Sequence, residues 1–277
     1  MKILFLFIFF LIQITQADRN GLCGSTSSQC EYSFLSQNGL LTIRGTGPMK
    51  EFSDESQQPW FDFRDEIRQI VIENGTSKIT RCAFENCQNL IKVTIPDSVT
   101  YIDTYAFHSC TSLKTVDFGK GLKTISSSAF IDCYQLESVV FPDTLESISL
   151  WSFQNCYSLK SIVLPDSVKS LSSFTFAFCK SLETVTIGKG LTSLDCYTFQ
   201  NCENLKEIIV SPENQIYLID NGVLMNKDKS SIFLYPAKKQ NSSYEIPSSV
   251  KVIESYSFME TYYLKSITIP NSVESIG

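Results

Sequence analysis

The residues of this sequence most able to do chemistry are ten cysteines and one histidine, His108. Six cysteines recur at a constant interval of 23 residues. They are Cys87, Cys110, Cys133, Cys156, Cys179 and Cys202. Metal sites group thiolates at short C-x-x-C spacings, whereas this interval predicts one row along a repeated structure. Neighbours in the row lie within disulfide reach, but parallel side chains disfavour the bond, so we expect buried free thiols.

His108 lies between Phe107 and Cys110 and is the candidate base for a Cys-His nucleophile. That chemistry needs a thiolate, an accessible cleft and an orienting group, whereas His108 falls in a predicted loop on the convex side of the repeat. A single histidine also excludes His-His metal sites. The Gly-x-Gly pieces lack the third glycine and the following helix of a nucleotide loop, so they are interpreted as turns. We therefore expect no enzyme activity, no cofactor and no metal.

The remaining cysteines lie outside the row. Cys23 and Cys30 are close together in an irregular N-terminal region, and we expect them to form a disulfide. Cys82 and Cys196 have no predicted partner. Two sequons predict N-glycosylation in a cell that has the machinery. Their acceptors are Asn74 and Asn241.

Composition narrows the class of protein. The 277 residues are 43% apolar and 12% aromatic, which is enough to build a core and excludes a disordered chain. A net charge of -6 argues against a nucleic-acid partner, which requires a basic stripe. Residues 1–17 combine Lys2, a short apolar run and a terminal Ala17, and this pattern predicts a secretory signal peptide. This signal peptide predicts an extracellular protein. No later segment is apolar enough to span a membrane.

The cysteine row belongs to a 23-residue repeat that also sets the apolar positions. A phenylalanine precedes each cysteine by three residues, and a leucine follows it by three. The phenylalanines are Phe84, Phe107, Phe130, Phe153, Phe176 and Phe199. Each unit then carries a short alternating strand and a turn such as Pro96-Asp97-Ser98-Val99. One unit cannot bury its apolar face alone, but stacked units can, and the period lies in the leucine-rich-repeat range.

These observations predict a mostly β, right-handed leucine-rich-repeat solenoid with a short helical turn per coil at Ala-Phe-x-x-Cys. An N-terminal cap is expected over residues 18–55 and the solenoid over residues 56–277. The solenoid divides into a degenerate coil, regular coils, a hairpin insert signalled by Asn221-Gly222, and a further coil. Their ranges are 56–78, 79–210, 211–252 and 253–277. The last two residues begin another coil, so we expect a truncated chain.

The repeat pattern A-F-x-x-C-x-x-L-x-x-V-x-I-P-x-S-V-x-x-I resembles the treponemal-type leucine-rich repeats of BspA-like surface proteins. The stretches Gly39–Ile43, Gly45–Met49 and Pro59-Trp60, and the insert Asn221–Leu224, are also similar to this family. The resemblance covers about residues 38–277. It implies an extracellular or cell-surface protein associated with adhesion to host or matrix proteins or to other cells, and it supplies no catalytic residues.

The positions that face outward from the strands are the candidate binding site. Val140 and Val163 are apolar, lie in adjacent coils and are not needed for the core, which suits a protein-contact patch. The full candidate set is Thr115, Asp117, Ser138, Val140, Ser161, Val163, Thr184 and Thr186. The plainer interpretation is a solvated sheet, because β-branched residues also favour strands.

Two functions fit this sequence. The first is a secreted or surface-displayed protein that binds an extracellular protein ligand through this face. The alternative is a structural coat component whose rods pack side by side without a specific ligand. Next to the candidate face, the charge alternates coil by coil and predicts ion pairs between coils. This row is Lys114, Glu137, Lys160, Glu183 and Lys206.

Overall fold

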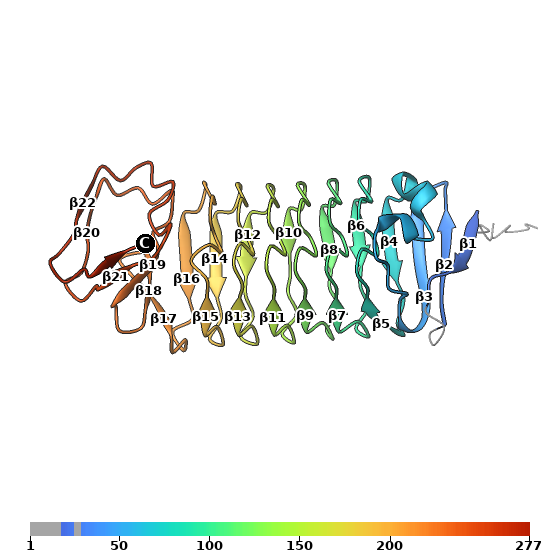
Figure 1. The fold of residues 1–277 in the computed structure, drawn as a ribbon, viewed down its shortest axis with the longest axis horizontal. Coiled ribbons are helices and arrows are strands. Elements are labelled where there is room, and N and C mark those ends of the chain that lie inside the picture. The colour runs from blue at the N-terminus through green and yellow to red at the C-terminus, as the bar shows by residue number, and fades with distance from the viewer. Residues whose placement is uncertain (1–17, 25–28) are drawn as a thin grey trace, which may run out of the picture.

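A computed structural model describes residues 18–24 and 29–277, and the predicted signal peptide lies outside these residues. The described chain is an elongated rod of stacked coils with the cap at one end (Figure 1). Strands of successive coils pair in parallel at the 23-residue interval, so Ile79 is opposite Ile102 and Ile102 is opposite Ile125. The predicted mostly β solenoid is confirmed. None of the helices in the described part of the chain is long and apolar enough to cross a membrane.

The cap begins as an antiparallel meander, and its last strand pairs in parallel with the first coil. Strands β1 (Arg19–Leu22), β2 (Gln29–Leu35) and β3 (Leu40–Pro48) pair in order. Strand β3 then pairs with both β4 (Gln69–Ile72) and β5 (Thr76–Ile79), so one long strand starts both sheets of the rod. Two short 3-10 helices lie between β3 and β4. They are η1 (Glu55–Gln57) and η2 (Phe61–Glu66).

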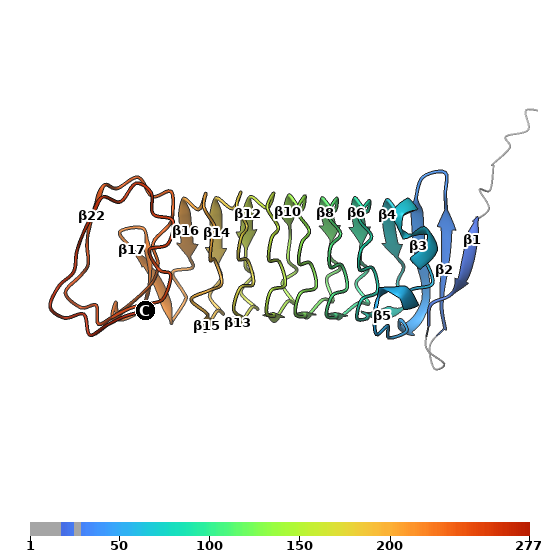
Figure 2. The ribbon, with the colours of Figure 1, turned by 45° about the horizontal axis from the view of Figure 1, so that its top comes forward.

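Each coil contributes one strand to each of two parallel sheets (Figure 2). After β4, the first sheet takes the even-numbered strands as far as β16. These are β6 (Lys92–Thr94), β8 (Thr115–Asp117), β10 (Ser138–Val139), β12 (Ser161–Val163), β14 (Thr184–Ile187) and β16 (Glu207–Val210). After β5, the second sheet takes the odd-numbered strands. These are β7 (Tyr101–Ile102), β9 (Thr124–Ile125), β11 (Ser147–Ile148), β13 (Ser170–Leu171) and β15 (Ser193–Leu194). The second sheet is continuous, whereas the first is interrupted between β10 and β12.

A ladder of phenylalanine rings fills the core between the sheets. Ring centroids of neighbouring coils are 5.0 Å apart for Phe107 and Phe130 and 5.1 Å apart for Phe130 and Phe153. At the cap, Trp60 stacks 5.1 Å from Phe84, and its indole Nε1 donates to the Ala83 carbonyl at 3.0 Å. The indole therefore closes the ladder and shields its first phenylalanine from solvent.

The Ala-Phe-x-x-Cys segments form consecutive hydrogen-bonded turns, which differs in detail from the expected helical turn. The Ala83 amide bonds to Thr80 within its own coil, but the Phe84 amide donates to Ala106 of the next coil at 2.8 Å. Successive amides therefore point in turn into their own coil and toward the next coil. This alternation requires some residues in the left-handed region, and Cys82 and Asn86 accordingly have φ values of 53° and 60°. This corner therefore adds hydrogen bonds between coils.

The predicted Asn221-Gly222 hairpin is confirmed. Strands β17 (Tyr217–Asp220) and β18 (Val223–Asn226) are antiparallel, and both turn residues have positive φ, as a two-residue turn of this hand requires. Strand β19 (Ser231–Leu234) continues the meander and then pairs in parallel with β21 (Val252–Ile253). The remaining strands are β20 (Ser243–Glu245), β22 (Ser266–Thr268) and β23 (Ser275–Ile276). Because β20 also pairs with β22, much of the expected insert already has coil-like pairing.

Candidate functional site

The structure places all eight predicted binding residues on one face of the first sheet. Ser138 is in register with Thr115, Ser161 with Thr184, and Val163 with Thr186. Residues that alternate with them along the strands are buried. These inward residues are Val116, Val139, Ile162 and Val185. The eight side chains therefore point away from the core, and the sequence periodicity is enough to identify them.

Two apolar side chains dominate the exposed part of this face. Val140 is 80% exposed and Val163 is 60% exposed, although both lie in coils whose core positions are filled. Ser138 and Ser161 flank them on the same face, and both are also exposed. Ile209 adds a further apolar side chain two coils along and is 45% exposed. The arrangement is an apolar centre with a hydroxyl-rich border, as in protein contact surfaces.

Ion pairs run beside this face between neighbouring coils. Lys114 is 3.8 Å from Glu137, and Lys206 is 2.8 Å from Glu183, so two of the pairs predicted from the alternating charges are present. These side chains are about half exposed, and such pairs contribute only about 0.2–1 kcal/mol each. They neutralise the border of the face and help to fix the register of the coils.

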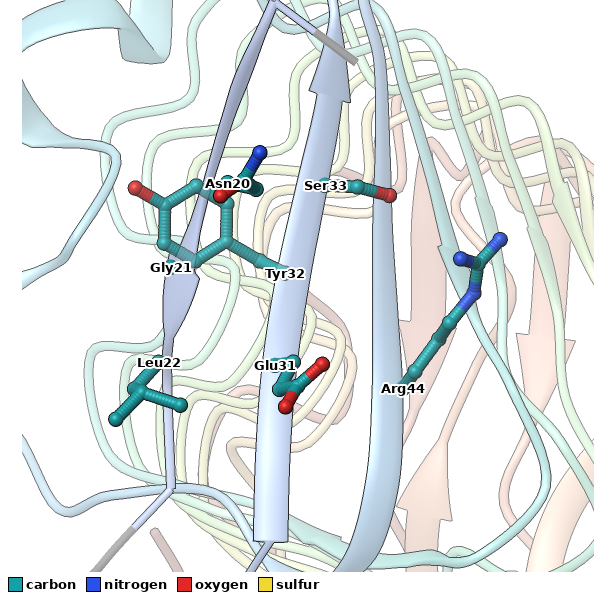
Figure 3. Close-up of a pocket in the computed structure, with 7 residues that line it drawn as sticks. All are labelled: Asn20, Gly21, Leu22, Glu31, Tyr32, Ser33 and Arg44. Atoms are coloured by element: carbon teal, nitrogen blue, oxygen red, sulfur yellow. The ribbon is translucent and has the colours of Figure 1, made fainter. Parts of the chain in front are cut away.

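A hollow lies on the cap, at the N-terminal edge of the same sheet (Figure 3). It has a volume of about 380 Å³. Its lining is Asn20, Gly21, Leu22, Glu31, Tyr32, Ser33 and Arg44. The Arg44 side chain forms an ion pair of 2.9 Å with Glu73. The sequence did not reveal this hollow, because the cap does not follow the repeat and offers no column of equivalent residues.

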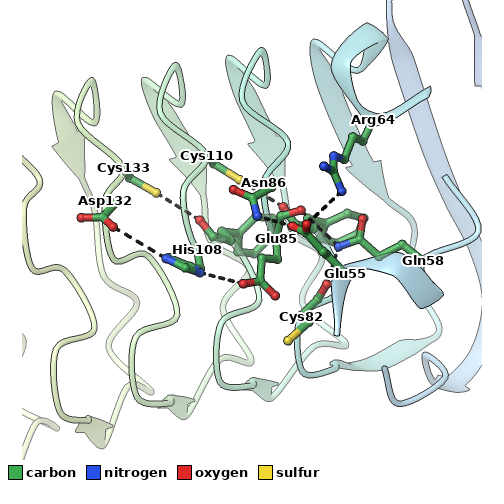
Figure 4. Close-up of polar contacts among 12 residues, drawn as sticks. Glu55, Gln58, Arg64, Cys82, Glu85, Asn86, His108, Cys110, Asp132 and Cys133 are labelled. Atoms are coloured by element: carbon green, nitrogen blue, oxygen red, sulfur yellow. Dashed lines mark hydrogen bonds and ion pairs between the residues drawn. The ribbon is translucent and has the colours of Figure 1, made fainter. Parts of the chain in front are cut away.

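His108 is held between two carboxylates of the neighbouring coils (Figure 4). Its Nδ1 lies 2.8 Å from Glu85 Oε1, and its Nε2 lies 3.6 Å from Asp132 Oδ2. The Asn155 amide donates to the other oxygen of Asp132 at 2.7 Å. The hydrogen bond with Glu85 raises the pKa of His108 above its usual value. Sequence inspection missed this cluster, although Glu85 lies one repeat before His108 and could have revealed it.

His108 and the row cysteines do not form a nucleophile. Cys110 is fully buried, and its Sγ–H donates to the Phe84 carbonyl at 3.2 Å rather than to the imidazole. Burial raises the pKa of Cys110 well above its usual value, which suppresses the thiolate. Burial and the nearby Glu85 carboxylate raise the pKa of Cys82 to about 12. Within residues 18–24 and 29–277, no group of three or more histidine, cysteine or acidic side chains could hold a metal ion.

The predicted Cys23–Cys30 pair is brought together but is not bonded. The two residues face each other across β1 and β2, and the Cys23 amide donates to the Cys30 carbonyl at 2.9 Å. Both thiols are buried and free in the structure, as are the six row cysteines. Their disulfide remains a prediction for the oxidised protein. The two predicted glycosylation acceptors, Asn74 and Asn241, are exposed.

The chain matches the family described as BspA type leucine-rich repeat region. Six copies of the repeat are recognised, over residues 57–157, 123–241 and 229–277. No curated protein matches the chain.

Solved structures share the fold. A leucine-rich repeat protein from Eubacterium ventriosum is 27% identical with a TM-score of 0.66, over 94% of this chain and 62% of that one. This chain therefore spans less than two thirds of that protein. A leucine-rich repeat protein from T. pallidum is 28% identical with a TM-score of 0.51, over 64% of this chain and 78% of that one. A leucine rich cell surface protein from Faecalibacterium prausnitzii is 24% identical with a TM-score of 0.60, over 93% and 73% of the two chains, and shows similarity of fold alone.

Proposed function

Since the chain belongs to the BspA-type leucine-rich-repeat family, we propose that it is an extracellular repeat protein that binds another protein. The contact surface is the outward face of β8, β10, β12 and β14. The secretory pattern at residues 1–17 supports an extracellular location. The described residues form a scaffold of stacked coils, in which the six row cysteines are buried in the core and His108 contacts carboxylates of the neighbouring coils. This arrangement suits display of a surface rather than chemistry.

The observation that carries the proposal is the exposure of Val140 and Val163. Most of both side chains faces solvent, and other residues of the same coils, such as Val139 and Ile162, fill the core. Serine and threonine surround them, so the patch combines apolar contact with hydrogen-bonding groups at its border. Both sheets follow the same repeat, but the predicted patch occupies only the first of them.

The size of this face sets the expected affinity. Four neighbouring strands span three spacings of about 4.8 Å, or roughly 14 Å along the rod. A stable protein interface buries about 800 Å² on each partner, so the contact must extend onto neighbouring coils. We therefore expect modest affinity for a single rod. Adhesion then depends on avidity between many displayed copies.

Two double variants test the face, and both lie in the same two coils. Val140→Asp with Val163→Asp places charge on the patch, whereas Tyr134→Asp with Tyr157→Asp changes an exposed apolar pair elsewhere on those coils. Binding to a panel of immobilised matrix proteins is measured by biosensor. The valine variant is expected to lose binding by tenfold or more while it keeps the wild-type circular dichroism spectrum, and the tyrosine variant is expected to bind normally.

The opposite pattern of results would overturn the assignment. Intact binding by the valine variant, together with loss after changes in the β17–β18 hairpin, would move the contact surface to the hairpin. Ordered self-assembly of the rods without binding to any panel member would favour the structural coat.

A further inference from the structure

The outward sheet is broken inside the proposed binding face. In regular coils, the residue that follows the strand bonds to the next coil: the Ile95 amide donates to Asp117 at 2.9 Å, and the Leu164 amide donates to Thr186 at 2.9 Å. The equivalent bonds from Phe118 to Val140 and from Phe141 to Val163 are missing in these fully described coils. Strand β10 ends at Val139, one residue earlier than β8 and β12, and does not pair with β12.

The sequence supplies a cause for the break. The inward position after the strand holds Ile95 and Leu164 in neighbouring coils, but Phe118 and Phe141 in these two. The Phe118 ring packs edge-on against Phe130 at 5.8 Å, and the Phe141 ring packs edge-on against Phe153 at 5.6 Å. A phenyl ring at this position needs more room than an aliphatic side chain, and a close-packed core yields that room by moving the backbone. The ladder bond is therefore lost at both phenylalanines: at the ends of β8 and β10, which stay paired before that point, and between β10 and β12, which do not pair.

A groove lies on the exposed face between the ends of β8 and β10, beside the missing bond from Phe118 to Val140. Its volume is about 260 Å³, and Val140 stands beside it with 80% of its surface exposed. The groove is lined by Thr115, Val116, Asp117, Phe118, Ser138 and Val140. The Phe118 N–H and the Val140 carbonyl lack the inter-coil bond that equivalent groups make elsewhere in the sheet. Backbone groups in this condition are strong, unpaired hydrogen-bonding sites.

The charge and the hydrogen-bonding groups of the groove define what fits it. Asp117 is the charged residue of the lining, and its side chain is 55% exposed in a weak pair with Lys92. A main-chain amide supplies both an acceptor for the Phe118 N–H and a donor for the Val140 carbonyl. An extended peptide with a basic residue next to a branched apolar residue would also meet Asp117 and the two exposed valines.

From these features we propose that the break is the anchoring point of the face, occupied by an extended, basic-apolar peptide segment of the protein partner. This inference rests on the proposed binding function and specifies where the partner docks and what its docking segment contains. Main-chain hydrogen bonds, with side chains adding selectivity, hold extended peptides at exposed sheet edges. The Phe118 N–H and the Val140 carbonyl offer the same kind of bond at the ends of β8 and β10.

The test converts the break into a regular coil by replacing two inward side chains, the buried Phe141 and the half-buried Phe118, which also lines the groove. Phe118→Ile with Phe141→Leu installs the residue types of neighbouring coils. Hydrogen exchange followed by NMR is expected to show fast exchange at the Phe118 and Phe141 amides of the wild type, compared with Ile95 and Leu164. In the variant, exchange at positions 118 and 141 is expected to slow by tenfold or more. Protected Phe118 and Phe141 amides in the free wild type would overturn the proposal.

The binding probe is a set of peptides selected from a random phage-displayed library on the wild-type rod. Selected peptides are expected to protect the Phe118 amide and to bind the Phe118→Ile, Phe141→Leu variant at least tenfold more weakly. Should that variant fail to fold, the single Phe118→Ile variant serves in its place. Equal binding to wild type and variant, protection elsewhere, or no selected peptide would each refute the docking point. Matrix-protein binding could be lost in the Val140→Asp, Val163→Asp variant but kept in the phenylalanine variant. That result would support the proposed binding face and overturn only the proposal that the break anchors the partner.

Discussion

Each cysteine of the buried row fills space in the core, and the five from Cys110 to Cys202 also donate to a carbonyl of the preceding coil. The Cys133 thiol donates to Phe107 at 3.3 Å, and Cys179 donates to Phe153 at 3.4 Å. Burial raises the pKa of these thiols, so the reactive thiolate is suppressed in the folded protein. The 23-residue spacing predicted the row and its burial, but the sulfur–carbonyl bonds depend on side-chain direction and came only from the structure.

Thiol titration checks this state of the row. The six row cysteines are expected to resist an aromatic disulfide reagent in the native protein and to react after denaturation without reductant. Six fast-reacting thiols in the native protein would contradict burial. An absence of new thiols after unfolding would show that the row is oxidised.

His108 makes stability depend on pH in a predictable direction. Its folded-state pKa is raised by Glu85, so protonation favours the folded state. This contribution is fully present below the unfolded-state pKa of about 6.5 and is lost as pH rises through the higher folded-state value. Urea unfolding is expected to show that His108→Gln loses more stability at pH 5.5 than at pH 8.5. The control is Gln154→Asn, at the equivalent position two coils along, and it should show no such trend. A larger loss of stability in His108→Gln at high pH than at low pH would contradict stabilisation by the protonated His108 between Glu85 and Asp132.

At the scale of elements, the phenylalanine ladder joins the two sheets. Phe153 is fully buried and stacks between Phe130 at 5.1 Å and Phe176 at 5.5 Å. Phe153→Ala is expected to reduce the free energy of unfolding by about 3–5 kcal/mol, because it leaves a cavity in the middle of the ladder. Urea denaturation measures the loss, with Tyr157→Ala as an exposed aromatic control in the same coil. Wild-type stability of the Phe153 variant would contradict the stacking.

The repeat made most of the elements predictable and explains where prediction stopped. Columns such as Val93, Val116 and Val139 identify inward strand positions, because one register applies to every coil. The break at Phe118 and Phe141 was not predictable in this way, since both residues fit the apolar pattern and only ring size distinguishes them. The cap hollow was not predictable, because it is formed by non-repeating sequence. The hydrogen bonds of the corner turns were not predictable either, because they depend on contacts between coils.

At the scale of the molecule, the strands that carry the candidate face, β8, β10, β12 and β14, follow one another in successive coils in the middle part of the rod (Figure 1). Regular coils fix the distances between exposed residues, so a partner meets a preorganised surface and little ordering is needed on this side of the interface. The area of the candidate face on one rod is small. Binding by many copies acting together is therefore favoured over one tight complex. Beside the face, Lys114 pairs with Glu137 and Lys206 pairs with Glu183, and Asp117 is the charged residue of the face itself.

A hydrogen-exchange footprint of the rod bound to a matrix protein identified by biosensor tests the central claim most directly. Peptides that cover β8, β10, β12 and β14 are expected to exchange more slowly in the complex, with the strongest protection around Val140. The strands of the second sheet in the same coils, β9, β11 and β13, are expected to stay unchanged. Protection confined to the β17–β18 hairpin or to the second sheet would contradict binding through this face.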